Sequence, residues 1–309
     1  MVSRKTGKGK TFLILFLFII VEATIVFYLL YSFIVKPGIN KGNQMKVVTP
    51  DPAPVEITET IEVTKQIDLQ PVVDNWAKSV GGTKSVLIYD PITNKTIASY
   101  NPEQRYNTAS LYKLFVVYEG YLRIENGTWN GEDYIMRGKT RYACLDLAIR
   151  ESNSPCAESL WNEIGHAELD RIIKEDYGIT NSNISNLTST PGDILKIMQM
   201  YYKHEKFSDG VWNTIKDSML NQPVTTYDWR RGLPKGFSNR VDVYNKVGWK
   251  WGNRDWDIYH DAAILDFKEL DRKFIVVVLT NHVANQKIAE LGTTIENAVY
   301  AALSEEKAQ

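Results

Sequence analysis

The chain has few of the residues that build disulfide frameworks or metal centres. Its 309 residues include two cysteines and four histidines, and the two cysteines do not form a Cys-x-x-Cys pair. A disulfide scaffold needs several cysteine pairs, and a structural zinc site needs closely spaced Cys or His ligands. We therefore expect neither a metal ion nor a cofactor.

A surplus of positive charge is also missing. Lys and Arg number 36 against 37 Asp and Glu, which leaves a formal net charge of -1. A protein that binds nucleic acid must neutralise phosphates with a basic surface, so a nucleic-acid partner is not expected. Hydrophobic residues make up 44% of the chain and charged residues 24%, a composition that excludes disordered and collagen-like classes.

One long apolar run stands near the N-terminus. Thr11 to Val35 contain a single acidic residue, Glu22. About 20 apolar residues suffice for a helix to cross the hydrocarbon core of a membrane, so residues 11–35 are predicted to be a transmembrane anchor. Val21-Glu22-Ala23 could instead serve as a signal-peptidase site. An uncleaved anchor is favoured because the apolar run continues well beyond Ala23.

The charges around this run predict its orientation. Four basic residues, Arg4, Lys5, Lys8 and Lys10, precede it within residues 1–10. Positive residues stay on the cytoplasmic side, so residues 1–10 are predicted to be a cytoplasmic tail in a single-pass protein of the cell membrane. Residues 36–66 contain four prolines and no helical period, which indicates an extended extracytoplasmic tether. Residues 67–309 then form one extracytoplasmic domain.

The order of elements in residues 67–309 predicts the fold class. Strand patterns occur near both ends of this region, and helical patterns fill its middle. Such an order indicates an α+β fold, an antiparallel sheet built from both termini and flanked by helices, with an all-helical insertion. The expected strands are 85–89, 96–100, 241–249, 260–266 and 274–280; the expected helices are 69–79, 110–124, 141–150, 155–164, 167–175, 190–203, 209–219 and 288–303.

A serine and a lysine are placed for covalent catalysis at the start of a predicted helix. Ser110 and Lys113 are three residues apart and so share one helix face. A serine hydroxyl becomes a nucleophile when a neighbouring base takes its proton, and an unprotonated lysine can be that base. The same Ser-x-x-Lys spacing recurs at Ser304 and Lys307 in a polar tail, so the spacing alone is weak and usually without catalytic meaning.

Two further segments follow Ser110 in a meaningful order. Ser152-Asn153-Ser154 forms a turn between two helical patterns, and Lys246-Val247-Gly248 lies in a strand. With these three segments the chain resembles the class A β-lactamase-like serine hydrolases, whose motifs are Ser-x-x-Lys, Ser-Asp-Asn and Lys-Thr-Gly. Arg231-Gly-Leu-Pro and His260-Asp261 add to a resemblance that covers about residues 67–305.

The resemblance implies a role for each matched residue. Ser110 would form an acyl-enzyme while Lys113 accepts its proton, and Ser152 would pass a proton to the leaving nitrogen. Lys246 would lower the pKa of Lys113 by like-charge repulsion and attract a substrate carboxylate. The backbone N–H groups of Ser110 and Trp249 would form the oxyanion hole. The expected substrate-binding residues are Ser154, Gly248 and Arg254.

The second and third motifs depart from the family pattern. The literal Lys-Thr-Gly of this chain is Lys5-Thr6-Gly7, in the predicted cytoplasmic tail. In the matching strand, Val247 lacks the hydroxyl that usually helps to hold the substrate carboxylate, and Arg254 is a candidate replacement or a surface residue. Asn153 and Ser154 replace the aspartate and asparagine of the second motif.

The residue that hydrolyses the acyl-enzyme in class A enzymes has no counterpart in the expected loop. Residues 178–193 contain no glutamate. Glu158 and Asn162 match the Glu-x-x-x-Asn pattern as text, but they lie inside the helix that follows Ser152, so Glu158 is interpreted as a solvated helix residue. We therefore expect a long-lived acyl-enzyme and doubt efficient β-lactam turnover.

Several residues near the motifs allow two interpretations from the sequence. Cys144 and Cys156 flank the Ser152 turn and could form a disulfide or remain buried thiols. His260 and Asp261 are expected to make hydrogen bonds at a strand end rather than to act in catalysis. A tryptophan group could line a cleft or cap the sheet; its members are Trp249, Trp251 and Trp256.

Three functions are compatible with these residues. The first is a membrane-anchored serine hydrolase that forms an acyl-enzyme with β-lactams. The second is a D,D-peptidase that acts on D-Ala-D-Ala-like peptidoglycan stem peptides with the same residues. The third is a non-catalytic module that binds wall peptide or a partner protein, which the altered motifs leave open.

Overall fold

The computed structural model describes residues 66–223, 230–250 and 257–304. The predicted cytoplasmic tail, the anchor at 11–35 and the tether up to residue 65 lie outside these ranges. Within the ranges, no helix is long and apolar enough to cross a membrane.

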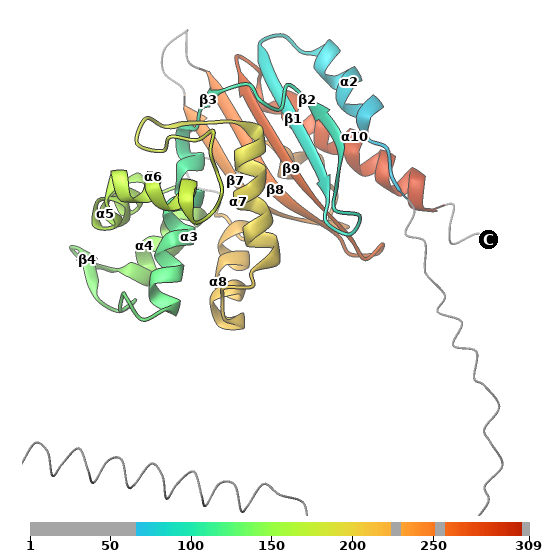
Figure 1. The fold of residues 1–309 in the computed structure, drawn as a ribbon. Helices are drawn as coiled ribbons and strands as arrows, with labels where there is room; N and C mark the ends of the chain where they lie inside the picture. Colours follow the sequence, from blue (N-terminus) through green and yellow to red (C-terminus); the bar gives the residue numbers. More distant parts are fainter. Residues whose placement is uncertain (1–65, 224–229, 251–256, 305–309) are drawn as a thin grey trace, which may run out of the picture. The chain divides into compact units, whose positions relative to one another are not determined.

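A five-stranded sheet forms the centre of the described domain, with strand order β2-β1-β9-β8-β7. Each neighbouring pair is antiparallel. The predicted sheet assembled from both ends of the domain is thus confirmed (Figure 1). Runs of Val, Ile and Leu fill its central strands, as is typical of strands covered on both faces. The strands are β1 (Thr83–Asp90), β2 (Lys95–Tyr100), β7 (Val241–Lys250), β8 (Ile258–Phe267) and β9 (Arg272–Asn281).

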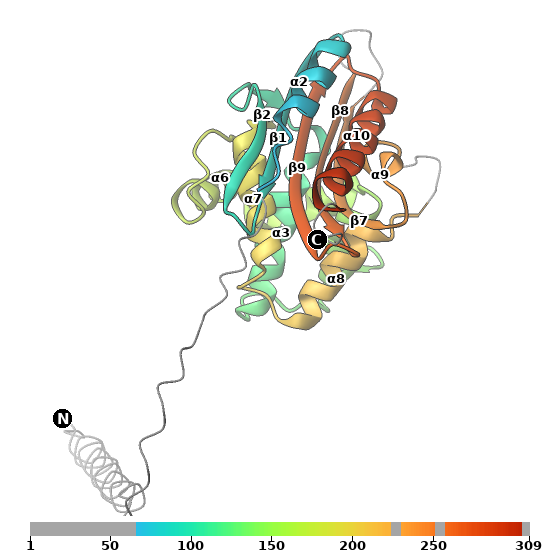
Figure 2. The same cartoon turned by 90° about the vertical axis from the view of Figure 1, so that its right-hand side faces the viewer.

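Helices cover both faces of this sheet (Figure 2). The terminal helices α2 (Gln70–Ser79) and α10 (Asn285–Ser304) pack on one face, where they enclose one apolar core. The inserted helices enclose a second apolar core against the other face. They are α3 (Tyr112–Glu125), α4 (Arg141–Arg150), α5 (Ser154–Ile164), α6 (His166–Glu175), α7 (Pro191–Lys203) and α8 (Asp209–Leu220), while the short α9 (Leu233–Gly236) packs on α10.

The beginning of the helix expected at 110–124 differs from the prediction. Ser110 lies in a 3-10 helix, η1 (Ala109–Leu111), and the α-helix α3 begins only at Tyr112. Ala109 has a φ of 43°, in the left-handed region that non-glycine residues rarely adopt. This turn of the backbone prevents a regular α-helix from starting at Ser110. Two small ribbons were also not predicted: β3 (Tyr106–Asn107) with β6 (Thr188–Ser189), and β4 (Tyr134–Met136) with β5 (Lys139–Thr140).

His260 joins the sheet to the segment that carries Ser110. It lies within β8 and is completely buried, rather than at a strand end as expected. The backbone N–H of Thr280 donates to His260 Nδ1 at 2.9 Å, so the ring proton is on Nε2, which donates to the Asn107 carbonyl at 2.8 Å. Both ring nitrogens are therefore satisfied by the neutral tautomer. Burial lowers the pKa of His260 to about 4.

This arrangement predicts a pH-dependent contribution of His260 to stability. The folded pKa, about 4, lies below the ordinary value of 6.5, so the unfolded chain binds the extra proton first as the pH falls. The contribution of neutral His260 to the free energy of unfolding is therefore complete above pH 6.5 and is lost as the pH falls towards 4. We expect His260→Gln to reduce the free energy of unfolding at pH 7, with the difference from wild type narrowing by at most about 1.4 kcal/mol per pH unit below pH 6.5.

Urea unfolding of both proteins at several pH values measures this difference. Other titrating groups, including the neighbouring Asp261, are present in both chains and cancel in the comparison. A difference that stays constant from pH 7 to pH 4 would contradict the buried neutral histidine.

Candidate active site

Ser110 and Lys113 meet at the junction of η1 and α3. Lys113 Nζ lies 3.1 Å from Ser110 Oγ, within hydrogen-bond distance. Ser110 is half-buried, while Lys113 is fully buried. The predicted pair is therefore brought together even though the 3-10 turn replaces the first turn of an α-helix.

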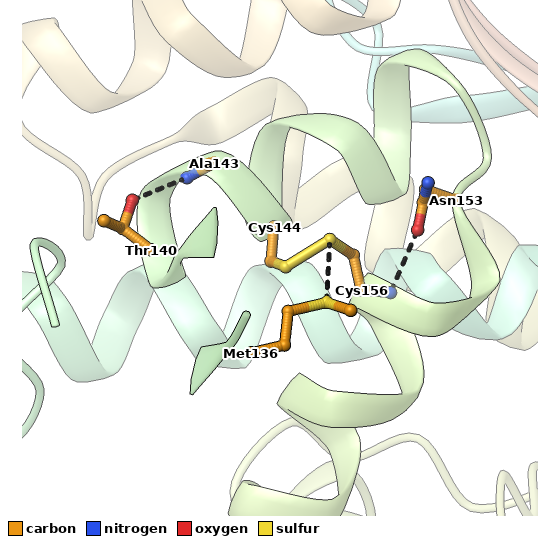
Figure 3. The surroundings of a disulfide bond; sticks show 6 residues. All are labelled: Met136, Thr140, Ala143, Cys144, Asn153 and Cys156. Atoms are coloured by element: carbon orange, nitrogen blue, oxygen red, sulfur yellow. Dashed lines mark hydrogen bonds between the residues drawn. A yellow bond between two sulfur atoms is a disulfide. The ribbon is translucent and has the colours of Figure 1, made fainter. Parts of the chain in front are cut away.

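The Ser152 turn is held from both sides. Ser152 connects α4 to α5 and has a φ of 53°, a strained backbone conformation of the kind found at functional sites. Asn153 caps α5 by accepting the Cys156 N–H at 3.0 Å. Cys144 of α4 and Cys156 of α5 form a disulfide that spans the turn (Figure 3). Of the two alternatives for these cysteines, the structure has the disulfide.

Ser152 lies between the two candidate lysines. Its Oγ is 3.3 Å from Lys113 Nζ and 2.8 Å from Lys246 Nζ. Lys113 also donates to the Ser152 carbonyl and, at 3.1 Å, to Ser154 Oγ. Ser110, Lys113, Ser152 and Lys246 thus form one continuous hydrogen-bonded chain, although they come from three separate parts of the sequence.

Burial controls the protonation of both lysines. It lowers the pKa of Lys113 from 10.5 to about 8, so roughly a tenth of this amine is neutral at pH 7 and about half at pH 8. The pKa of Lys246 is held well below its ordinary value, first by burial and then by the positive charge of Lys113. Burial is thus the first cause of the low pKa of Lys113, and the predicted repulsion between the two amines is present as a force that disfavours charging both of them.

A buried carboxyl group lies behind Lys246. Asp261 Oδ1 accepts a hydrogen bond from Asn245 Nδ2 at 2.8 Å, and its Oδ2 accepts the Leu233 N–H at 2.9 Å. Burial raises the pKa of Asp261 to about 7, and its negative charge favours the protonated form of Lys246. Asp261 lies within β8 and not at the strand end that was predicted. Asn245, which donates a hydrogen bond to Asp261, was not predicted as a site residue.

Gly248 allows β7 to approach the Ser110 turn. A Cβ atom at this position would lie 2.6 Å from the Thr108 carbonyl oxygen and 2.8 Å from Leu111 Cγ. Such distances are far inside van der Waals contact, so only glycine fits without a shift of the backbone. Gly248 was predicted as a substrate-binding residue; the contact that the structure shows is with the turn that carries the nucleophile.

The other predicted binding residues have different outcomes. Ser154 lies at the start of α5, is exposed, and contacts Lys113. Trp249 follows Gly248 on β7, an edge strand of the sheet, and its ring packs edge-on against Tyr259 at 5.7 Å. Arg254, like Trp251 and Trp256, lies outside the described residues.

Glu158 is exposed, but it is more than a solvated helix residue. Its negative charge raises the pKa of Lys113, opposing part of the effect of burial, and it also raises the pKa of Tyr112. The carboxylate thus faces the beginning of α3. The sequence signal that was available is the four-residue spacing of Ser154 and Glu158, which places both on one face of α5.

A cavity of about 360 Å³ lies away from these residues, between α7, α8 and the sheet. Aromatic rings and lysines line it, including Trp212, Tyr244 and Lys216. None of the predicted catalytic residues contributes to its wall, so this cavity is separate from the Ser110 cluster.

Residues 68–303 match the model of a protein family described as the beta-lactamase enzyme family. The chain belongs to the β-lactamase enzyme family. This assignment agrees with the predicted resemblance and with the α+β fold. Comparison with curated proteins gave no match.

Solved structures of β-lactamases, among them class A enzymes, share this fold at low sequence identity. An ancestral (GNCA) class A β-lactamase superposes with a TM-score of 0.65 at 17% identity, covering 75% of this chain and 100% of that chain. A class A representative from Bacteroides cellulosilyticus DSM 14838 gives a TM-score of 0.66 at 14% identity, with 77% and 100% covered. A β-lactamase from Xanthomonas campestris pv. campestris str. ATCC 33913 gives 0.65 at 13%, with 76% and 100% covered. The chain is thus a family member with a β-lactamase-like serine hydrolase fold.

Proposed function

We propose that this protein is an extracytoplasmic serine hydrolase that forms an acyl-enzyme on Ser110 with β-lactams or D-Ala-D-Ala-like amides. One observation carries the proposal: the Ser110 hydroxyl lies 3.1 Å from an amine, Lys113, whose pKa is lowered to about 8. A lysine that is partly neutral near the working pH can accept a proton from serine, and enzymes lower lysine pKa values for this purpose.

The acylation step follows from the hydrogen-bonded chain. Ser110 Oγ attacks the amide carbonyl and gives its proton to Lys113, while the backbone N–H groups of Ser110 and Trp249 hold the oxyanion. Ser152, between the two amines, donates its proton to the leaving nitrogen and is reprotonated through the chain. The carbonyl carbon is then an ester of Ser110, and the amide C–N bond is broken.

Substrate binding rests on the charge of Lys246, on Ser154 and on a second cation predicted from the sequence. A substrate carboxylate beside Lys246 raises the pKa of that amine and so favours its charged form. Ser154 offers a short hydroxyl to the substrate at the start of α5, and Arg254 supplies a second cation for the carboxylate that Val247 cannot bind.

An extracytoplasmic location is part of the proposal. The apolar run at 11–35 and the tether at 36–66 would hold the domain outside the membrane. The Cys144–Cys156 disulfide supports this location, because disulfides persist in oxidising compartments and are rare in the cytosol.

A D,D-peptidase is the second candidate, favoured by one feature of the sequence. Residues 178–193, where class A enzymes are expected to carry their hydrolytic glutamate, contain none. The same acylation machinery would then act on peptidoglycan stem peptides, with β-lactams as slowly released substrates.

Labelling with a fluorescent penicillin tests the proposal. The full-length protein, in membranes or detergent, is expected to become covalently labelled, and Ser110→Ala is expected to remain unlabelled while keeping the thermal stability of the wild type. If the wild type takes up no label at millimolar penicillin, the acyl-enzyme is excluded and the non-catalytic module is favoured. Turnover of a chromogenic cephalosporin and of a D-Ala-D-Ala peptide then separates lactamase from peptidase.

A further inference from the structure

One face of α5 is directed at the beginning of α3. Ser154 Oγ lies 3.1 Å from Lys113 Nζ, and the Trp161 ring lies 5.0 Å, centroid to centroid, from the ring of Tyr112. Glu158 lies one turn after Ser154 and one turn before Trp161 on this face. Its side chain is therefore positioned beside two consecutive residues of α3, one of which is the candidate catalytic lysine.

The same region contains one buried polar atom that lacks a protein partner and one that faces Glu158. Trp161 Nε1 forms no hydrogen bond with another residue in the described ranges, whereas the Tyr112 hydroxyl lies within hydrogen-bonding reach of the Glu158 carboxylate. Each of these side chains is only about 5% exposed. Buried polar groups are almost always hydrogen-bonded, either to protein or to ordered water. Trp161 Nε1 is thus a donor available to an ordered water on this face of α5.

We propose that Glu158 is the general base that activates this water for hydrolysis of the acyl-enzyme on Ser110. The inference rests on the proposed function, because it requires an acyl-enzyme. It assigns the carboxylate of α5 to the step for which residues 178–193 supply no glutamate. The carboxylate reaches the ester from the side of Lys113 and Ser154, rather than from the loop after α6.

The step is balanced in atoms and protons. The oxygen of water bonds to the acyl carbon, and one of its protons passes to the Glu158 carboxylate. The proton on Glu158 passes to the neutral amine of Lys113, and Lys113 passes a proton to Ser110 Oγ as the ester bond between the acyl carbon and Oγ breaks. The products are the free acid and the original enzyme, with Glu158 ionised and Lys113 neutral.

The charges of the cluster support this role. Glu158 raises the pKa of Lys113, which shows that the carboxylate and the amine are close enough to interact. Burial, and next the charge of Glu158 and a hydrogen bond to it, keep the Tyr112 phenol neutral, so Tyr112 retains the proton with which it can orient the carboxylate. Glu158 itself is exposed, so water has access from solvent.

Label release after a pulse of fluorescent penicillin tests the inference in the full-length chain. After excess penicillin is removed, we expect Glu158→Gln to release the label at least tenfold more slowly than the wild type. Its acylation should stay within about threefold of wild type at high pH and should extend to lower pH. The loss of the carboxylate leaves burial unopposed in lowering the pKa of Lys113.

Glu132→Gln is the matched control, because Glu132 is also exposed and lies far along the chain from the cluster, between α3 and α4. It should release the label as fast as the wild type. Equal release by Glu158→Gln and wild type, or a wild type that never releases its label, would overturn the inference while leaving the acyl-enzyme intact. Failure of the wild type to become labelled would instead overturn the proposed function.

Discussion

Replacing Lys113 by arginine is expected to slow acylation of Ser110 about a thousandfold, the middle of the range for general acid–base catalysis. Arginine keeps the positive charge and the hydrogen-bonding capacity at this position, but it does not give up its proton. The variant therefore separates two roles of Lys113, a base that accepts the serine proton and a cation that only orients the hydroxyl.

The pH dependence of acylation gives a second sign of the same role. Because Lys113 must be neutral to accept a proton and its pKa is about 8, the wild-type rate should fall about tenfold per pH unit below pH 8. Stopped-flow or gel-based labelling over pH 5 to 9 measures this fall in the acylation rate. Lys113→Arg should acylate slowly at every pH and should not show the fall.

Controls separate chemistry from damage to the buried site. Lys113→Met carries no charge, fits the space of the lysine stem and should be equally slow, and Lys174→Arg, an exposed residue of α6, should behave as the wild type. Circular dichroism and thermal unfolding show whether each variant is folded. A folded Lys113→Arg that acylates within tenfold of wild type would rule out Lys113 as the base.

Gly248→Ala is expected to reduce acylation about a hundredfold without unfolding the domain. The new Cβ would lie 2.6 Å from the Thr108 carbonyl oxygen, a backbone atom that cannot rotate away. Either β7 or the Ser110 turn must then move. A displacement of about 1 Å of a reacting group is enough to cost this factor in rate.

Gly210→Ala provides the comparison for this substitution. Gly210 lies in α8, and a Cβ there would meet no atom within 4 Å. Alanine is a better helix former than glycine, so this variant should acylate normally and be slightly more stable. Gly248→Ala should lose about 1–3 kcal/mol of unfolding free energy through overpacking. Acylation by Gly248→Ala within threefold of wild type would show that the close approach of β7 is not required.

Elements with a strong hydrophobic period were predictable. The strands Thr83–Asp90 and Arg272–Asn281 alternate or run apolar between turn residues, and helices such as Arg141–Arg150 coincide with their predicted bounds. The turn at Ala109–Leu111 was not predictable, because the 3.6 residue period continues through it. Only the left-handed backbone of Ala109, stabilised within the packed domain, stops the α-helix there.

The candidate site was predictable as a set of residue types and was not predictable as a set of contacts. The spacing of Ser110 and Lys113 brings that pair together by local geometry, and the order of the three motifs distinguished it from the same spacing at Ser304 and Lys307. Glu158 was interpreted as a solvated helix residue, and it is indeed exposed on α5. Its direction towards Lys113 depends on how α5 packs against α3, which a helical period cannot show.

The sequence alone determined three features: the order of strands and helices, the three motifs, and the absence of a glutamate in residues 178–193. Each of these is a local or linear property of the chain. The tertiary structure decided which atoms touch: the disulfide across the Ser152 turn, the position of Ser152 between two amines, and the burial that lowers the pKa of Lys113. These depend on distances between segments up to 94 residues apart, and only packing of the two cores sets such distances.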